Sequence, residues 1–185
     1  MRKSVKQQLA LRVLSTAALM AMVSSIATAA FADTYDLTKG SVDILAEGGK
    51  QYITQWEDKD NDTCVKDGEG KEIRDREDSD ITLTTKNETT DETETTGETE
   101  TTSNTVTIDA KEGNTANVTL QDVHIEVDTT DAKSGAIEIK GDGDTNLELN
   151  GDNTVLVENQ WSEEHAAIEK ADTYGKGTLT IKDDV

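Results

Sequence analysis

A repeat of about 30 residues in the C-terminal part of the chain constrains its fold more than any other feature. Short runs with paired apolar residues return at this spacing, and three such runs fall within each period. The repeated positions are Val106/Ile108, Ile137/Ile139 and Ile168; Val118/Leu120, Leu147/Leu149 and Leu179/Ile181; and Ile125/Val127 and Val155/Val157. Three strand-like runs per period are typical of one coil of a solenoid, so residues 105–185 are predicted to stack coil on coil. Ile137 and Ile168, and likewise Leu147 and Leu179, are then expected to be lateral neighbours.

Within each run, apolar and polar residues alternate. Val118 and Leu120 alternate with polar side chains, and turn formers such as Gly141-Asp142-Gly143-Asp144 separate one run from the next. Alternation at period two places one face of a strand in a core and the other in water. The pattern predicts an all-β fold, and the spacing of equivalent runs favours a right-handed parallel β-helix. An antiparallel β-sandwich is the alternative that the same alternation permits.

The N-terminal segment has the composition of a secretory signal. Its first part carries Arg2, Lys3, Lys6 and Arg12 and no acidic residue, and an apolar stretch and Ala30-Phe31-Ala32 follow. This three-part plan predicts a signal peptide over residues 1–32 and an extracellular or cell-surface location. A retained membrane anchor is the alternative. No second long apolar run follows, so no membrane span is expected after signal cleavage.

Net charge limits the partners that such a chain could bind. Removing the four basic residues of the signal from the 18 in the chain leaves 14 against 39 acidic residues, a net charge of −25. This charge repels phosphates and anionic lipid head groups, which argues against nucleic acid and membranes as partners and favours cations and neutral glycans. The single cysteine, Cys64, cannot form an internal disulfide, so stability is expected from coil stacking or from a metal.

The rest of the chain divides by composition into three parts. Residues 33–85 are expected to form N-terminal strands that cap the first coil, together with an acidic loop. Residues 86–104 consist almost wholly of Thr, Glu, Asp, Asn and Gly, have nothing to bury, and are predicted to be a disordered linker. Residues 105–185 are the β-helix coils. The last coil ends without a capping element, so the sequence is expected to be a fragment of a longer protein.

One acidic loop has the spacing of a calcium site. Four carboxylates stand at positions 1, 3, 5 and 12 of a possible calcium loop: Asp58, Asp60, Asp62 and Glu69. Hard oxygen ligands at this spacing can wrap a Ca²⁺ ion, which makes calcium a candidate cofactor. Thr63 replaces the glycine that the tight turn needs, and Lys66 occupies a ligand position. A plain solvated loop is therefore the competing interpretation.

A second acidic feature follows from the repeat. Asp122, Asp152 and Asp183 each come two or three residues after a pair of repeated apolar positions. Stacked coils would bring equivalent carboxylates to about 4.8 Å from one another, where like charges repel. Either these side chains accept hydrogen bonds from backbone amides in the turns, or a cation lies between them; the first is favoured.

The residues that could carry chemistry point to binding more than to catalysis. His124 is expected on a solvent-facing strand side and His165 in a loop, and no nucleophile motif accompanies either. No catalytic residue is therefore assigned. Four aromatic residues could stack on a sugar ring, and the first three are the candidate carbohydrate contacts: Trp161, Tyr174, Trp56 and Tyr52. Closing an end of the core is the alternative role for these rings.

Three stretches of the repeat resemble the coils of secreted surface proteins of Gram-positive, largely clostridial, bacteria. They are residues 116–125, residues 146–155 and the stretch from His165-Ala166-Ala167-Ile168 to Gly177-Thr178-Leu179-Thr180-Ile181. The family is that of carbohydrate-binding parallel β-helix proteins, whose fold is shared with pectate lyases. The resemblance covers roughly residues 105–185 and rests on repeat style without a catalytic signature. It implies a β-helix, a polysaccharide ligand and, in some members, calcium, but it transfers no site residue.

Together these patterns predict a secreted or cell-surface, non-catalytic β-solenoid that binds carbohydrate or serves in adhesion. Its expected partner is a polysaccharide or a cell-wall glycan. Two alternatives remain open at this point. One is a calcium-dependent polysaccharide lyase or hydrolase on the same fold, and the other is a structural spacer within a surface protein.

Overall fold

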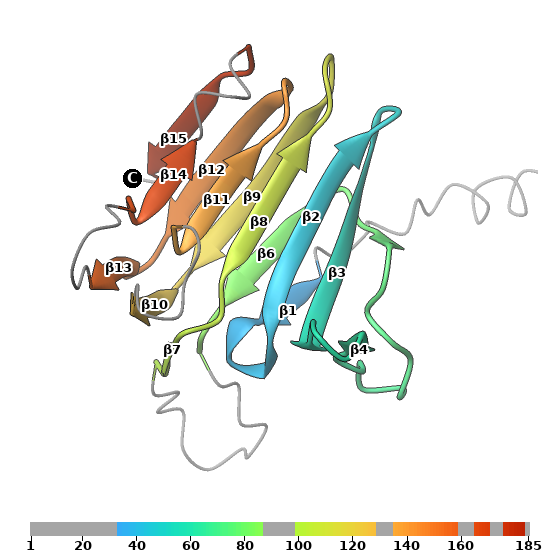
Figure 1. The fold of residues 1–185 in the computed structure, drawn as a ribbon, viewed down its shortest axis with the longest axis vertical. Coiled ribbons are helices and arrows are strands. Elements are labelled where there is room, and N and C mark those ends of the chain that lie inside the picture. Colours follow the sequence, from blue (N-terminus) through green and yellow to red (C-terminus); the bar gives the residue numbers. More distant parts are fainter. Residues whose placement is uncertain (1–32, 87–98, 129–134, 159–164, 171–175, 184–185) are drawn as a thin grey trace, which may run out of the picture. The chain divides into compact units, whose positions relative to one another are not determined.

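The described part of the chain consists of β-strands arranged in three sheets. A computed structural model describes residues 33–86, 99–128, 135–158, 165–170 and 176–183 (Figure 1). The predicted signal, residues 1–32, lies outside these ranges. The first sheet contains, in order, β14 (Ile168–Lys170), β11 (Ile137–Lys140), β8 (Val106–Ala110), β2 (Ser41–Glu47) and β3 (Lys50–Asp58), with β4 (Thr63–Cys64) and β5 (Arg76–Glu77) on β3. The second contains β1 (Thr34–Asp36), β6 (Ile81–Thr84), β9 (Thr115–Gln121), β12 (Asp144–Asn150) and β15 (Leu179–Asp183), and the third contains β13 (Thr154–Glu158), β10 (His124–Asp128) and β7 (Thr101–Thr102). A 3-10 helix, η1 (Leu37–Lys39), joins β1 to β2.

The strands visit the three sheets in a fixed order. From β8 onward, successive strands belong to the first, second and third sheet, and then the cycle begins again at β11 and at β14. Equivalent strands of successive cycles pair in parallel: β8 with β11 and β11 with β14, β9 with β12 and β12 with β15, and β10 with β13. The described chain is thus all-β with parallel sheets, compatible with a β-helix. The alternative of an antiparallel sandwich does not describe this part of the chain.

The registers test the two lateral pairs that the repeat predicts. Ile137 is the partner of Ile168 in the β11–β14 pair, as expected. Leu147, in contrast, is the partner of Ile181 in the β12–β15 pair, and Leu179 faces Thr145. The predicted pairing of Leu147 with Leu179 is therefore wrong by two residues. A shift of two keeps every side chain on its original face of the sheet, so the alternation in the sequence cannot distinguish the two registers.

The N-terminal strands belong to the same sheets as the repeat. β2 pairs in parallel with β8, and β6 pairs in parallel with β9, so residues 33–85 extend the first and second sheets. β3 runs antiparallel to β2 along the edge that β8 leaves free, which makes the first sheet mixed. Of the predicted linker 86–104, only Lys86 and residues 99–104 are described. There the chain forms β7 on β10, so the C-terminal end of that segment is part of a sheet.

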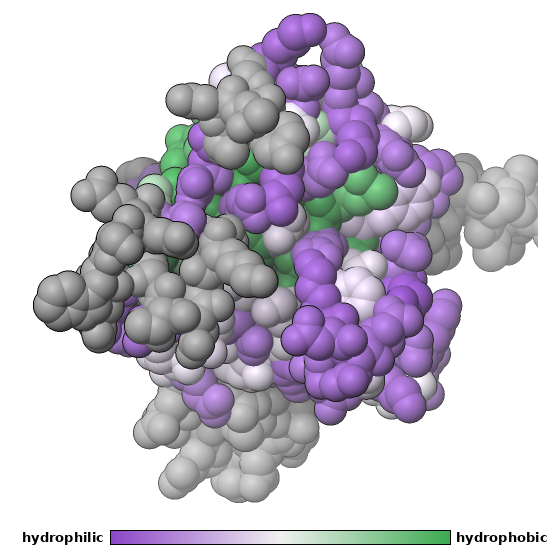
Figure 2. All heavy atoms as spheres, viewed as in Figure 1, coloured by the Kyte–Doolittle hydropathy of each residue, from purple (hydrophilic) through white to green (hydrophobic). Residues whose placement is uncertain are grey.

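The core consists of apolar side chains stacked in rows across neighbouring strands. One row of the first sheet runs through four strands, and its first three members are buried: Val42, Val106, Ile137 and the partly buried Ile168. A second row runs through Ile81, Val118 and Leu147 of the second sheet. Burial of each such side chain contributes about 1.5–3 kcal/mol. Apart from Leu45 on β2, the outward positions of the same strands carry Ser, Thr, Asn, Gln, Asp, Glu and Lys. Hydrophilic residues cover much of the coloured surface in Figure 2, with hydrophobic residues visible between them.

Within the described residues, no helix is both long and apolar enough to cross a membrane.

Candidate functional site

The outer face of the first sheet carries two aromatic side chains. The partly exposed Tyr52 and Trp56 alternate along β3 with the buried residues Ile53 and Gln55, so they lie on the face turned away from the core. Thr54 lies between them at the same alternate positions and is itself buried. Four residues along a strand separate the two rings by about 13 Å. The sequence places them there because β3 alternates at period two over this stretch. Trp56 is one of the three aromatic residues that the sequence names as a sugar contact.

These side chains line a groove of about 390 Å³, here called the sheet groove. It is lined by residues of β2, β3, β8 and β11 and of the connections that follow β3 and precede β5: Asp43, Ile44, Leu45, Tyr52, Thr54, Trp56, Lys59, Asp75, Thr107, Asp109 and Lys140. Residues far apart in the sequence meet here because β8 and β11 continue the sheet beside β2. Leu45 is opposite Tyr52 in the β2–β3 pair, and together they give the groove an apolar surface.

Trp56 is held in place by polar contacts. Its Nε1 donates a hydrogen bond to Oδ2 of Asp43 at 2.8 Å. The Arg74 guanidinium lies 5.2 Å and the Lys59 ammonium 5.9 Å from the ring centroid, both within cation–π range. Part of the indole surface is therefore covered by cations. Tyr52 takes part in no such contact among the described residues, which makes it the better sugar platform of the two.

The other predicted aromatic contacts, Trp161 and Tyr174, lie outside the described residues. The sequence also names Tyr52 as a ring able to stack on a sugar, but it does not show that Tyr52 and Trp56 share one groove with residues of β8 and β11. That proximity depends on the pairing of β2 with β8, strands that are separated by the whole of residues 48–105. The repeat begins at residue 105 and gives no signal for this pairing.

The predicted calcium loop is engaged in contacts of its own. The carboxylate of Asp58 accepts hydrogen bonds from the backbone amides of Asp60 and Asn61 and from Nδ2 of Asn61 at 2.6 Å. These hydrogen bonds hold the pKa of Asp58 below its ordinary value, and the bond from the Asn61 side chain contributes most. Asp62 accepts a 2.8 Å hydrogen bond from Nη1 of Arg74. Among the described residues, no group of three or more His, Cys, Asp or Glu side chains could hold a metal ion. Calcium in this loop thus stays a prediction.

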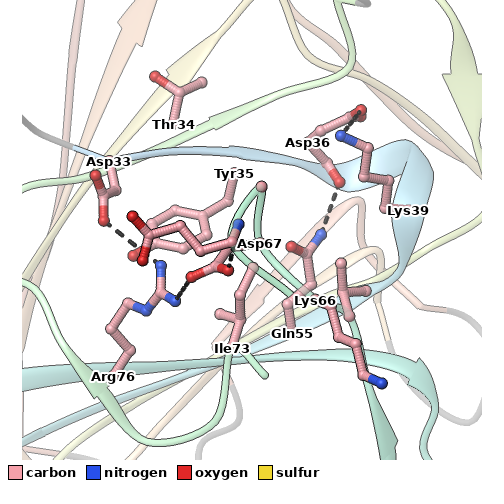
Figure 3. A pocket seen from close by; sticks show the side chains of 13 residues that line it. Asp33, Thr34, Tyr35, Asp36, Lys39, Gln55, Lys66, Asp67, Ile73 and Arg76 are labelled. Atoms are coloured by element: carbon pink, nitrogen blue, oxygen red, sulfur yellow. Dashed lines mark hydrogen bonds and ion pairs between the residues drawn. The ribbon is translucent and has the colours of Figure 1, made fainter. Parts of the chain in front are cut away.

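Glu69, the fourth predicted ligand, lines a second pocket of about 470 Å³ near η1 (Figure 3). Arg76 is its central cation; it forms an ion pair and hydrogen bond with Asp67, and its Nη1 lies 3.7 Å from a carboxylate oxygen of Asp33. Hydrogen bonds from the Lys71 amide and from Arg76 lower the pKa of Asp67. Tyr35 is buried and donates a 2.9 Å hydrogen bond to Asp78. Its burial is the main cause that raises the pKa of its phenol, and the hydrogen bond to Asp78 is the second.

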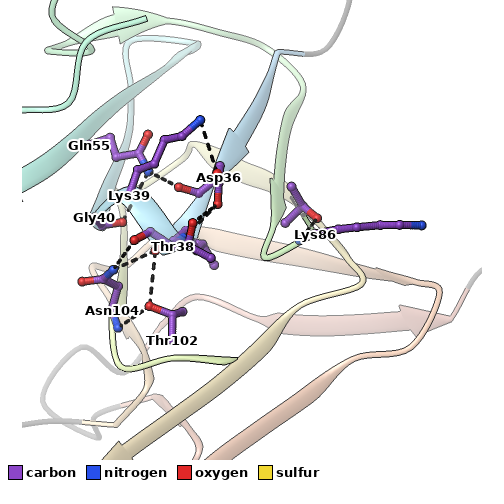
Figure 4. A network of polar contacts seen from close by, with 10 residues as sticks. Asp36, Thr38, Lys39, Gly40, Gln55, Lys86, Thr102 and Asn104 are labelled. Carbon is purple, nitrogen blue, oxygen red and sulfur yellow. Dashed lines mark hydrogen bonds and ion pairs between the residues drawn. The ribbon is translucent and has the colours of Figure 1, made fainter. Parts of the chain in front are cut away.

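A polar network closes the same end of the sheets (Figure 4). Nε2 of Gln55 donates to the backbone oxygen of Asp36 at 2.6 Å, and Nδ2 of Asn104 donates to the backbone oxygen of Leu37 at 2.8 Å. The Asp36 carboxylate in turn caps η1 by accepting from the amide of Thr38. Because the charged and polar groups of this region bind one another, the pocket near η1 is better explained as a structural element than as a ligand site.

The remaining candidates have structural contacts. Asp122 accepts a 3.0 Å hydrogen bond from the backbone amide of Asp152, which is the amide-binding role that the sequence favours. Asp183 is the strand partner of Leu149 in the β12–β15 pair. It therefore does not continue the predicted row of Asp122 and Asp152. His124 approaches the Asp152 carbonyl at 3.1 Å, and His165 lies 3.0 Å from a Glu169 carboxylate oxygen.

Comparisons of this chain with protein-family models, with curated proteins and with solved structures give no match.

Proposed function

We propose that this chain is a secreted or cell-surface protein with a right-handed parallel β-helix that binds carbohydrate through the sheet groove. The proposal is supported by one observation above all. On an outer surface made chiefly of polar side chains, Tyr52 and Leu45 form an apolar platform within a groove that is also lined by Trp56 and by carboxylates, ammonium groups and hydroxyls. An aromatic ring for the apolar face of a sugar, with polar groups around it for the hydroxyls, is what carbohydrate binding requires.

The β-helix supports this role because it holds the groove on rigid elements. The platform residues lie on strands that are paired on both sides, β2 between β3 and β8, and β3 between β2 and its partners β4 and β5. Side chains fixed on such strands lose little conformational entropy when a ligand binds. The groove is open at the surface, so it suits a segment within a long polysaccharide as well as a chain end.

The test is the retention of the purified chain on a glycan array and on insoluble polysaccharides. Wild-type protein is expected to be retained, and Tyr52→Ala is expected to lose most of this retention because it removes the platform. Thr119→Ala, on the outer face of β9 in the second sheet, is the matched control and should bind as the wild type does. Equal retention of Tyr52→Ala and wild type would place the binding elsewhere, and no retention on any glycan would favour a structural spacer.

The same assay separates binding from cleavage. Release of soluble sugar from a retained polysaccharide, with and without added calcium, would identify a lyase or hydrolase. Retention without release is the result that the proposal expects.

A further inference from the structure

We infer that the sheet groove selects sugars carrying a protonated amine, so that its ligand is a glycan with free amino groups; this inference rests on the proposed carbohydrate-binding function. Three carboxylates and two ammonium groups line the groove: Asp43, Asp75, Asp109, Lys59 and Lys140. Which of these charges remain available to a ligand decides its chemistry.

Both lysines of the groove already hold a carboxylate. Nζ of Lys59 lies 2.7 and 3.0 Å from the two carboxylate oxygens of Asp43. Nζ of Lys140 lies 2.8 Å from Oε2 of Glu138, two residues before it on β11. An acidic sugar would therefore have to approach each lysine beside a carboxylate of its own sign of charge, and this repulsion weakens the pairing.

Asp75 differs from the other two carboxylates of the groove because it is exposed, whereas Asp43 and Asp109 are partly buried. Its backbone amide donates to Oγ1 of Thr54 at 3.0 Å, and the same hydroxyl makes a long 3.4 Å contact with its Oδ1. No ion pair to Asp75 is found within the described residues. The backbone of Asp75 has a φ of 46°, which sets this residue at the turn that leads into β5. The groove therefore offers a carboxylate that a ligand ammonium could pair with.

Asp109, on β8, is the third carboxylate of the groove, and it is already paired with a lysine. Its Oδ2 lies 2.5 Å from Nζ of Lys111, and its Oδ1 is buried without a hydrogen-bond partner among the described residues. Because this carboxylate is paired with Lys111, it contributes little to the attraction of a ligand cation.

The charge of the whole chain acts in the same direction. The sequence has a net charge of −21, which attracts cationic glycans and repels uronates. Overall charge is not selective by itself, however. The groove becomes selective when the amino group lies beside Asp75 while the ring of the same sugar packs on Tyr52, because both contacts then depend on one sugar and act together.

The experiment compares three oligosaccharides by calorimetry at pH 6 and low salt, where primary amines are protonated. They are oligomers of β-1,4-linked glucosamine, of the neutral N-acetylglucosamine with the same backbone, and of galacturonate. We expect the glucosamine oligomer to bind tightest, the N-acetylated one more weakly, and the galacturonate oligomer not at all. The preference for the amine is expected to shrink as salt is added.

Two variants locate the selectivity. Asp75→Asn keeps the shape of the side chain and suits the positive φ of this position, and should weaken glucosamine binding roughly twofold to fivefold without affecting the neutral oligomer. Glu148→Gln removes the same charge from the exposed outer face of β12 in the second sheet and should change neither. An equal loss in both variants would mean that overall charge attracts the ligand, and would overturn the inference.

The remaining outcomes separate this inference from the function on which it rests. If the N-acetylated or galacturonate oligomer binds as tightly as the glucosamine oligomer, and Tyr52→Ala still abolishes binding, the charge selectivity is wrong and the carbohydrate site stands. If no glycan of any charge binds, the carbohydrate function itself is wrong, and this inference falls with it.

Discussion

Leu45 and Tyr52 stand directly opposite each other in the antiparallel pair of β2 and β3, on the face turned away from the core. Most outward positions of these sheets carry polar residues, so an aliphatic side chain beside an aromatic ring is an exception there. Neither side chain is needed to fill the core, which lies on the opposite face. Their position at the floor of the sheet groove is the reason that binding is assigned to this surface.

The Leu45→Ala variant is expected to weaken glycan binding several-fold, because it removes part of the apolar surface on which the sugar packs. Its free energy of unfolding should change much less than that of Ile44→Ala, the buried neighbour on the same strand. Affinity measured by calorimetry and stability measured by urea unfolding separate the two effects. A loss of stability as large as that of Ile44→Ala would show that Leu45 is a core residue.

The rows of apolar side chains predict a second result. Leu120 is fully buried between Leu83 and the partly buried Leu149 in the second sheet, so Leu120→Ala should lower the free energy of unfolding by about 2–5 kcal/mol. Thr119→Ala, one residue earlier and on the outer face, should change it by roughly 0.5 kcal/mol or less. Similar losses in the two variants would contradict the assignment of faces along β9.

Gly40 predicts a third result, because the chain passes very close to it. A Cβ added at Gly40 would lie 1.9 Å from the backbone oxygen of Trp56, although the φ of Gly40 is 161° and open to any residue. Gly40→Ala must therefore push β3 away and should cost about 1–3 kcal/mol of unfolding free energy. A Cβ added at Gly68 meets nothing within 4 Å, so Gly68→Ala is the matched control. Equal stability of the two variants would show that β3 does not approach Gly40.

Acid sensitivity is predicted at the pocket near η1. The pKa of Asp67 is lowered in the folded chain by the Lys71 amide and by Arg76, so the ionised carboxylate stabilises the fold. This contribution is complete above the unfolded pKa of about 3.9 and is lost as the pH falls through the lower folded value. Asp67→Asn should therefore lower the melting temperature near neutral pH and reduce its decline on acidification. Parallel pH curves for wild type and variant would contradict this role.

The period of the sequence reveals the strands of the repeat well, because a buried face requires alternation at every second residue. The lateral pair Ile137 and Ile168 follows directly from that period. The pair of Leu147 with Ile181 does not, since a two-residue slip leaves every side chain on the same face of the sheet. Register is therefore the part of such a fold that composition and alternation leave undetermined.

The groove could be predicted only in part. Trp56 and Tyr52 stand out in a chain with so few aromatic residues, and their type suggests a sugar ligand. Their neighbours Asp109 and Lys140 come from the repeat, and they reach the groove only because β2 adds to the sheet beside β8. The hydrogen bond between Asp62 and Arg74 joins residues twelve apart, so the spacing of the acidic residues gives no sign of it. A calcium-like spacing in the sequence therefore does not by itself establish a calcium site.

The most direct test of the account is the affinity of the wild-type chain and of Tyr52→Ala for a glycan that the array identifies, measured by calorimetry under identical conditions. We predict at least a tenfold loss of affinity in Tyr52→Ala, about 1.4 kcal/mol, with an unchanged unfolding curve. Equal affinities in two equally stable proteins would show that the sheet groove is not the carbohydrate site.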